Sequence, residues 1–525
     1  MRYKNMKITR LVILIFCAFL TKNNLVGQAA DTSSFEFFVY LEDNFLEDSL
    51  EIYLEDLNAT KVWQLPNKLC LWKVNGFPFT SNSGQTYFDI HAVIQSSKRK
   101  TQIKEADYNI AWNISPENID PNAPCFVPAD YSITDDNNTN ITVSILDTGI
   151  SPTINSSSTS GFNYNFTNYT GYDYVNNDNE PEDEHGHGTH IAGIIHSITH
   201  GVNVNADISF DIRKTHNSEG KAFASHVIKA MHDAMDANAD IINMSFGAKD
   251  TFGMGKFFPL RVALNTAFDR GVLIVAAAGN EAENIDLSES ATIPASFPED
   301  NLITVAALNC QDSLTAFSNY GRDQVDLGSI GWKVAGPDLS GGIKYVSGTS
   351  QATAIVTAQA ALLGTYLNAF DPVVVKCLLQ GSVIPLNQLD TLIGTGGKIN
   401  LSAAVSLINN SNTNYTVTNN LSSGLGSLRY GLEKHCFINQ INFSPSTAGQ
   451  IIPIIGRDLK VFKNLTLNGL GLAQTILEAQ GHHRALITGS NSVLTLKNLT
   501  IRNAGTFDQT ILNRGKLDIE NAKIK

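Results

Sequence analysis

Three side chains that together could hydrolyse an acyl bond stand far apart along this chain: Asp147, His187 and Ser350. A serine hydroxyl is a weak nucleophile near neutral pH, so it needs an imidazole to accept its proton and an acid to orient that imidazole. The chain supplies these groups in the order Asp, His, Ser, which is one of the orders in which such triads occur. The residue types therefore indicate nucleophilic catalysis by a serine.

The acid and the base each stand beside an element that could position them. Residues 143–146 are typical of a buried strand that ends at Asp147, and Gly149 allows the chain to turn there. His187 lies between two glycines, and the apolar residues 191–195 after it predict a packed helix. We therefore expect the acid at the end of a strand and the base beside the start of a helix.

The serine precedes a long run of small residues. Residues 352–363 predict a buried helix that begins next to Ser350. The first turn of such a helix offers free N–H groups and the positive end of the helix dipole. These groups would stabilise negative charge that develops beside the serine.

Each of these three side chains stands in a short motif. The motifs are Ile145-Leu146-Asp147-Thr148-Gly149, His185-Gly186-His187-Gly188-Thr189-His190 and Ser347-Gly348-Thr349-Ser350. They resemble the motifs of the subtilisin-like serine proteases (subtilases), and the resemblance extends over residues 142–405. It implies that Asp147 orients the base, that His187 is the base and that Ser350 attacks a peptide carbonyl.

The resemblance also implies an oxyanion site and a substrate pocket. Asn280 matches the family's oxyanion asparagine, and the Ser350 backbone N–H would be the second donor. Residues 243–247 are similar to the strand that aligns the substrate by backbone pairing. Two uncharged segments would form the pocket walls, so we expect a medium or large apolar residue before the cleaved bond, with Phe246 narrowing the pocket. The wall residues are Ser245, Phe246 and Gly247, and Ala277, Ala278 and Gly279.

A loop before the histidine motif concentrates oxygen ligands of the kind that calcium prefers. It spans residues 171–183, and Asp173, Asp178 and Asp183 are the candidate ligands. An acidic loop that is simply solvated explains the composition equally well. No His-Glu-x-x-His motif or cysteine cluster indicates zinc, and we expect no cofactor for catalysis.

Composition and the first residues limit the class of protein. The chain has 525 residues, of which 43% are hydrophobic, so it can bury a core and should hold several domains. Its net charge of −13 gives no reason to expect nucleic-acid binding. Basic residues followed by the short apolar run 11–20 predict a signal peptide over residues 1–29. We therefore expect a secreted or cell-surface protein.

Cysteines leave the covalent framework open. After removal of the signal peptide and of the segment described next, Cys125, Cys310, Cys377 and Cys436 remain. Four cysteines allow three complete pairings, and isolated thiols are about as compatible with the sequence.

Residues 30–113 predict a small α+β domain. Strands are expected at 35–41, at 61–74 with a break near Pro66, and at 102–110, with helices at 48–57 and 90–98. In the subtilase family such a segment is an inhibitory propeptide, so the resemblance implies that the chain's own propeptide is an intramolecular inhibitor. Self-cleavage would fall between residues 109 and 129. An independent N-terminal binding domain is the alternative.

After the catalytic domain predicted at 114–408 and a polar linker at 409–415, residues 416–525 favour short strands. The near-repeat of residues 465–469 and 499–503 is typical of stacked rungs in a parallel β-helix. Residues 426–429, followed by a short amphipathic helix, resemble the cap of β-helical surface-protein modules. A small β-sandwich is the alternative, and the module is a candidate for attachment to a cell surface.

Together these observations predict an α/β fold with a parallel sheet and helices on both faces, between a small propeptide and a β-rich module. The function implied is that of a secreted serine endopeptidase made as a zymogen, acting on protein or peptide substrates. A surface adhesion protein that keeps the protease fold without its activity is the second hypothesis. Esterase chemistry is disfavoured because Ser350 lacks the Gly-x-Ser-x-Gly elbow.

Overall fold

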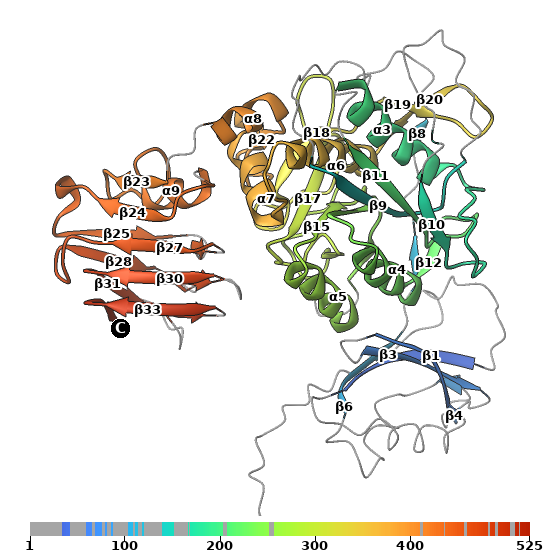
Figure 1. Ribbon diagram of the computed structural model, residues 1–525, viewed down its shortest axis with the longest axis horizontal. Coiled ribbons are helices and arrows are strands. Elements are labelled where there is room, and N and C mark those ends of the chain that lie inside the picture. Colours follow the sequence, from blue (N-terminus) through green and yellow to red (C-terminus); the bar gives the residue numbers. More distant parts are fainter. Residues whose placement is uncertain are drawn as a thin grey trace, which may run out of the picture.

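The computed structural model (Figure 1) describes a central domain, a C-terminal module and parts of the N-terminal region. The described residues are 34–41, 59–65, 69–75, 79–80, 86–87, 103–108, 111–113, 118–119, 139–151, 166, 169–202, 207–250, 257–409, 413–434, 436–455, 459–461, 463–480, 484–488, 492–503, 510–513 and 515–525. Within them, no helix is both long and apolar enough to cross a lipid bilayer.

A nine-stranded sheet forms the centre of the molecule. Its strands pair in the order β10-β11-β9-β13-β15-β17-β18-β22-β21. Every neighbouring pair is parallel except β21 with β22 at one edge. The strands are β9 (Ile141–Asp147), β10 (Thr170–Asp173), β11 (Ile208–Lys214), β13 (Ile241–Met244), β15 (Leu273–Ala277), β17 (Leu302–Leu308), β18 (Leu327–Ile330), β21 (Ile384–Pro385) and β22 (Gly397–Lys398).

Helices cover both faces of this sheet, which confirms the predicted α/β class. On one face, α3 (His187–Val202) and α6 (Thr349–Thr365) share a hydrophobic core with the sheet. On the other face, α4 (Ala224–Asp236) and α5 (Phe258–Asp269) share a second core. Figure 1 shows α6 against the sheet and α4 and α5 on its opposite side.

The apolar pattern of the sequence explains this layering. In β9, Ile141, Val143 and Ile145 enter the first core, whereas Leu146 enters the second. A strand buried on both faces reads as a continuous apolar run, as parallel sheets require. Every residue of α6 is buried, and its many alanines let the sheet and α3 approach it closely.

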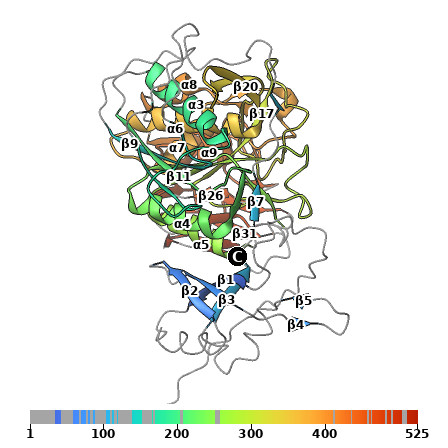
Figure 2. The same cartoon turned by 90° about the vertical axis from the view of Figure 1, so that its right-hand side faces the viewer.

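The N-terminal strands form a separate antiparallel sheet in the order β2-β3-β1-β6. The strand pair expected at 61–74 is present as β2 (Ala59–Gln64) and β3 (Leu69–Asn75), beside β1 (Ser34–Leu41) and β6 (Ile103–Tyr108). Leu65, Leu69 and Leu71 belong to the core that contains α4 and α5, so this sheet packs on those helices (Figures 1 and 2). The helices expected at 48–57 and 90–98 lie outside the described residues.

Parallel strands stack into three ladders in the C-terminal module, so the structure has a parallel β-helix and not a β-sandwich. The ladders are β23-β24-β27-β30-β33, β25-β28-β31-β34 and β26-β29-β32. Their strands are β23 (Asn414–Val417), β24 (Gln440–Phe443), β25 (Gln450–Ile454), β26 (Leu459–Val461), β27 (Leu465–Asn468), β28 (Thr475–Ala479), β29 (Leu486–Thr488), β30 (Val493–Lys497), β31 (Thr500–Asn503), β32 (Ile511–Asn513), β33 (Lys516–Glu520) and β34 (Lys523–Ile524).

An asparagine ladder runs along one corner of this β-helix. Asn468 Nδ2 donates to Asn442 Oδ1 at 3.1 Å, Asn498 Nδ2 to Asn468 Oδ1 at 3.4 Å and Asn521 Nδ2 to Asn498 Oδ1 at 2.8 Å. Each amide therefore satisfies the one in the neighbouring rung, which fixes the stacking register at the turn.

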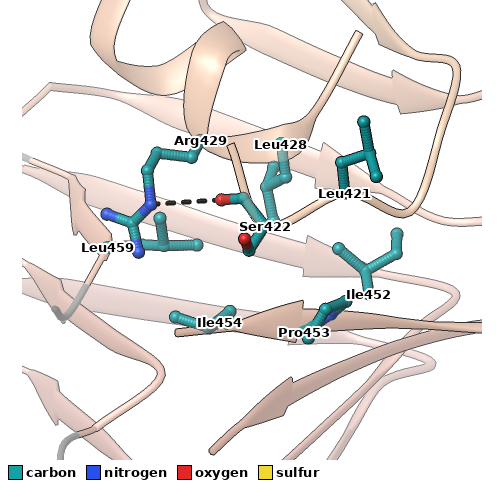
Figure 3. Close-up of a pocket in the computed structure, with 8 residues that line it drawn as sticks. All are labelled: Leu421, Ser422, Leu428, Arg429, Ile452, Pro453, Ile454 and Leu459. Carbon is teal, nitrogen blue, oxygen red and sulfur yellow. Dashed lines mark hydrogen bonds between the residues drawn. The ribbon is translucent and has the colours of Figure 1, made fainter. Parts of the chain in front are cut away.

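A helical cap closes the first rung and faces the central domain. Arg429, in α9 (Leu428–Lys434), donates from Nε to the Ser422 carbonyl at 3.3 Å, and Figure 3 shows both residues above the apolar side chains of β25. Helix α7 (Pro372–Gly381) of the central domain is joined to the module by the Cys377–Cys436 disulfide. Cys310 is disulfide-bonded as well. The cap is thus covalently tied to the central domain.

The remaining elements are short connections. They are β4 (Phe79–Thr80), β5 (Thr86–Tyr87), β7 (Ala111–Asn113), β8 (Asn118–Ile119), β12 (Lys221–Phe223), β14 (Ala248–Lys249), β16 (Thr292–Ile293), β19 (Val334–Pro337), β20 (Ile343–Ser347), α8 (Leu401–Asn409), η2 (Asn387–Leu389) and η3 (Pro445–Thr447).

Candidate active site

The candidate residues gather at one edge of the central sheet. Strand β9 ends at Asp147, and helices α3 and α6 begin at His187 and Thr349. The carboxyl ends of parallel strands meet at the same edge, where open α/β sheets bind their ligands. Gly149 turns the chain away from this edge with φ of +110°, and a side chain at that position would clash with the Pro181 carbonyl oxygen.

Asp147 and His187 form a buried hydrogen-bonded pair. The His187 Nδ1–H donates to Asp147 Oδ1 at 2.7 Å, and the exposed fractions of the two side chains are 0% and 1%. The Thr148 backbone N–H donates to the same oxygen at 2.7 Å. When Nδ1 donates to a carboxylate, Nε2 carries the lone pair that accepts a proton. The pair therefore holds the imidazole in the form that a general base needs.

Ser350 lies in the first turn of α6, and its hydroxyl contacts a neighbouring segment. Its Oγ–H donates to the Ser245 carbonyl oxygen at 2.7 Å, and Ser245 Oγ donates to the Ser350 carbonyl oxygen at 3.1 Å. A hydroxyl has a single proton, so in this rotamer that proton is directed at the carbonyl. Transfer of this proton to His187 requires the hydroxyl group to turn away from the Ser245 carbonyl oxygen.

Two donors and one acceptor lie around Gly348. The point where a Cβ of Gly348 would stand is 2.6 Å from Gln351 Oε1, 3.6 Å from Asn280 Nδ2 and 3.7 Å from the Ser350 backbone nitrogen, so the Gln351 amide oxygen fills part of this region. Asn280 Oδ1 accepts from the Thr349 N–H at 2.9 Å and from Thr349 Oγ1 at 3.0 Å. Because these bonds use the amide oxygen, they orient the amide so that its NH₂ group faces the other way.

Thr349 is a site residue that sequence reasoning missed. Besides donating to Asn280, its Oγ1 accepts from the Gly279 N–H at 3.2 Å, so it joins the start of α6 to the end of β15. Its position directly before the serine, in a helix N-terminal turn, was the available signal.

The two predicted pocket walls follow neighbouring strands of the sheet. Ser245, Phe246 and Gly247 come directly after β13, whereas Ala277 ends β15 and leads into Ala278 and Gly279. The Phe246 side chain is 2% exposed and packs edge-on against His216, with ring centroids 4.5 Å apart. Its ring thus lies in the core beneath the segment, and this placement lends no support to the prediction that Phe246 narrows the pocket.

His216 was also missed, and it lies against the acid. Its backbone N–H donates to the Asp147 carbonyl oxygen at 3.1 Å, and its Nδ1 is 2.9 Å from Thr215 Oγ1. Burial lowers the pKa of His216 to about 4, with Asp147 opposing this shift and His187 adding to it. The imidazole is therefore neutral near neutral pH. The sequence feature that could have identified His216 is its position two residues after β11, the strand that pairs with β9.

Calcium binding gains no support from the three aspartates, because they do not converge. Asp178 accepts from the Glu180 N–H, and Asp173 accepts from the ammonium of Lys214. Asp183 accepts from Thr148 Oγ1, Thr189 Oγ1 and three backbone N–H groups. Burial would raise the pKa of Asp183, but these hydrogen bonds outweigh it and lower the pKa. Among the residues the structure describes, no three ligand side chains form a metal-binding group.

Two short strands of the N-terminal region lie along the same edge. Strand β7 pairs antiparallel with β12, with Trp112 opposite Ala222, and it lies close to β14, which follows Gly247. Strand β8 pairs antiparallel with β20, with Asn118 opposite Ser347. Strands β7 and β8 thus pair with two different segments of the central domain, and the second of these, β20, leads directly into the serine motif.

The Subtilase family model matches residues 138–419. A "Thermophilic serine proteinase" from Bacillus sp. (strain AK1) is 34% identical over 199 residues, which cover 37% of this chain and 46% of that protein. "Thermitase" from Thermoactinomyces vulgaris is 30% identical over 246 residues, which cover 45% of this chain and 80% of thermitase. The "Cell wall-associated protease" of Bacillus subtilis (strain 168) is 31% identical over 228 residues, or 42% of this chain and 23% of that protease.

The crystal structure of a cold adapted subtilisin-like serine proteinase matches with 27% identity and a TM-score of 0.40, covering 50% of this chain and 94% of that one. The chain spans less than half the length of several of the curated relatives that it matches.

Proposed function

Since this chain belongs to the subtilase family, we propose that it is a serine endopeptidase that hydrolyses peptide bonds through an acyl-enzyme. The observation that carries the proposal is the buried hydrogen bond of 2.7 Å between His187 and Asp147, at the sheet edge where α6 presents Ser350. An acid that orients an imidazole, with an alcohol from which the imidazole can take a proton, is the set of groups that activates a serine.

In the first step, Ser350 Oγ attacks the peptide carbonyl carbon while its proton passes to His187 Nε2. Asp147 stabilises the imidazolium that forms and keeps the ring oriented. Negative charge develops on the former carbonyl oxygen, which the Asn280 Nδ2–H and the Ser350 N–H would bind. The C–N bond then breaks, and His187 returns the proton to the departing amine.

The second half of the reaction repeats these steps with water. Water loses a proton to His187 as its oxygen attacks the acyl ester, and collapse of the tetrahedral intermediate returns the proton to Ser350 Oγ. The segments that end β13 and β15 would bind the substrate backbone as an added strand. Since neither segment carries a charge, we expect a medium or large apolar side chain before the cleaved bond.

We further propose that the chain is made as a zymogen and processes itself. The pairing of β7 with β12 and of β8 with β20 supports this, because it lays the N-terminal region along the edge where a substrate strand would bind. The bond to be cleaved would lie between Asn113 and Asn118, within the interval predicted from the sequence. The sheet formed by β1, β2, β3 and β6 would then remain bound to α4 and α5 as an inhibitor.

Export and surface attachment belong to the same proposal. Residues 1–29 would direct secretion, and two relatives are named "Minor extracellular protease Epr" and "Cell wall-associated protease". The β-helix would be the part that contacts a cell surface.

Purified full-length chain and its Ser350→Ala variant, each incubated with an unfolded protein, test the activity. Intact-mass analysis tests the processing in the same samples. We expect substrate cleavage and one new N-terminus between Asn113 and Asn118 in the wild type, and neither in the variant. Equal, negligible cleavage of the substrate by both proteins would favour the non-enzymatic adhesion hypothesis.

A further inference from the structure

A lysine ammonium is buried at the carboxyl end of β11, between the carboxylate of the last residue of β10 and a carboxylate of the loop that precedes His187. Lys214 Nζ lies 3.1 Å from Asp173 Oδ2 and 2.9 Å from Glu184 Oε2. Lys214 is 1% exposed and Asp173 is fully buried, whereas the Glu184 side chain is 55% exposed. Lysine is almost never fully buried unless it is paired, so this arrangement requires an explanation.

Asp173 uses its carboxylate to hold a tight turn. Its Oδ1 accepts from the Val175 N–H at 2.7 Å and from the Asn176 N–H at 2.9 Å, and its Oδ2 accepts from Asn176 Nδ2 at 3.0 Å. Asp173 and Asp178 also exchange two backbone hydrogen bonds across the turn. Because Asp173 holds this turn together, the contact of the Lys214 ammonium with Asp173 also fixes the position of the whole turn.

The backbone of Lys214 is fixed on the other side. It pairs with Asp147 in the parallel ladder between β11 and β9, and its carbonyl oxygen accepts from the Tyr174 N–H at 2.9 Å. The lysine thus connects the strand that ends in the acid to the turn at Asp173. Its other partner, Glu184, lies three positions before His187 in the sequence.

We propose that the Lys214 ammonium is the resident cation of this loop: it occupies the place between Asp173 and Glu184 that a bound metal ion would take, and it thereby positions His187. The statement that Lys214 positions His187 rests on the proposed proteolytic function, whereas the statement that Lys214 takes the place of a metal ion does not. Burial would lower the pKa of Lys214, but hydrogen bonds with Glu184 and Asp173 outweigh it and raise the pKa, so the group stays charged. Without a cation, one fully buried carboxylate would face a second carboxylate with no counter-charge.

Replacing the ammonium by an external cation tests the first part. In Lys214→Ala the two carboxylates keep their places and an empty volume replaces the side chain, so we expect the variant to bind Ca²⁺ and Tb³⁺. Tyr172 and Tyr174 flank Asp173 in sequence and would sensitise Tb³⁺ luminescence. We expect a melting temperature that is lowered in the variant and raised again by Ca²⁺, and that EDTA leaves unchanged in the wild type.

Two further variants keep the test decisive if Lys214→Ala does not fold. Glu184→Gln removes only the charge of a half-exposed carboxylate, and we expect a folded enzyme with kcat lowered about two- to fivefold and KM little changed, since an exposed ion pair is worth about 0.2–1 kcal/mol. Lys516→Ala, which breaks an exposed ion pair with Asp518 in the β-helix, is the matched control and should alter nothing.

The result that would overturn the cation role is a wild-type melting temperature that EDTA lowers, or a Lys214→Ala variant that Ca²⁺ does not stabilise. An unchanged kcat in Glu184→Gln would overturn the positioning role. Melting and luminescence do not depend on proteolysis, so failure of this inference and failure of the proposed function are distinguishable.

Discussion

Ser350 and Ser245 hydrogen-bond to each other reciprocally, each hydroxyl donating to the other's backbone carbonyl, at 2.7 Å and 3.1 Å. This relationship ties the start of α6 to the segment after β13 that would align a substrate. In this arrangement the Ser350 hydroxyl proton is donated to the Ser245 carbonyl oxygen. The hydroxyl must break that hydrogen bond before it can donate its proton to the His187 imidazole.

The oxyanion role of Asn280 can be separated from its structural role. Asn280→Asp keeps an oxygen that accepts from Thr349 but loses the Nδ2 donor. We expect kcat to fall by about a hundred- to a thousandfold with little change in KM, which is the usual effect of removing one oxyanion donor. Steady-state kinetics on a peptide substrate measures it. A variant that folds normally and keeps kcat within threefold of wild type would rule out this role.

The orienting role of Asp147 predicts a larger loss. Asp147→Asn keeps the shape of the side chain but removes the charge and favours the wrong imidazole tautomer, so kcat should fall by about ten-thousandfold. Kinetics at neutral pH, with circular dichroism to confirm folding, is the measurement. If a folded variant loses less than tenfold, the hydrogen bond between Asp147 and His187 is only structural.

His216 predicts a specific pH dependence of stability. Its pKa of about 4 lies below the ordinary value of 6.5, so the unfolded chain binds a proton at this residue that the folded chain does not. Stability is fully present above pH 6.5 and declines as pH falls toward 4, by about 3 kcal/mol from this residue. His216→Gln should show a smaller loss across that window in urea unfolding curves. Parallel curves for the two proteins would contradict the assignment.

The disulfide between Cys377 and Cys436 should stabilise the contact between the β-helix and the central domain. Its two cysteines are 59 residues apart in sequence. Closing a loop of that length restricts the unfolded chain, which typically stabilises a fold by about 2–4 kcal/mol. We expect the Cys377→Ser, Cys436→Ser double variant to show an earlier thermal transition in calorimetry, with kcat unchanged. An identical transition temperature would show that packing alone holds the cap.

Local patterns allowed much of the fold to be predicted. The apolar residues before Asp147 and the small residues after Ser350 correspond to β9 and α6. An element that is buried on all its faces has an uninterrupted run of apolar or small residues, which can be recognised in a single sequence. The β-helix was predicted from the near-repeat of residues 465–469 and 499–503, but the prediction that these two segments stack on each other was wrong. Residues 465–468 stack on 494–497, whereas residues 500–503 belong to the next ladder, because two successive strands carry almost the same alternating pattern.

What could not be predicted depends on contacts between distant residues. Asp173 looks like a calcium ligand until β10 and β11 pair and bring Lys214 to it. The depressed pKa of His216 requires burial beneath Phe246, and no local pattern reports that. The direction of the Phe246 ring likewise depends on the core around α4 and α5.

Covalent labelling of the serine tests the central claim most directly. The processed protein would be treated with phenylmethylsulfonyl fluoride, assayed for peptide hydrolysis and digested for mass spectrometry. The account predicts that loss of activity parallels sulfonylation of Ser350 alone, and that Ser350→Ala is neither labelled nor active. Hydrolysis that persists in Ser350→Ala, or inactivation with the label on another residue, would contradict it.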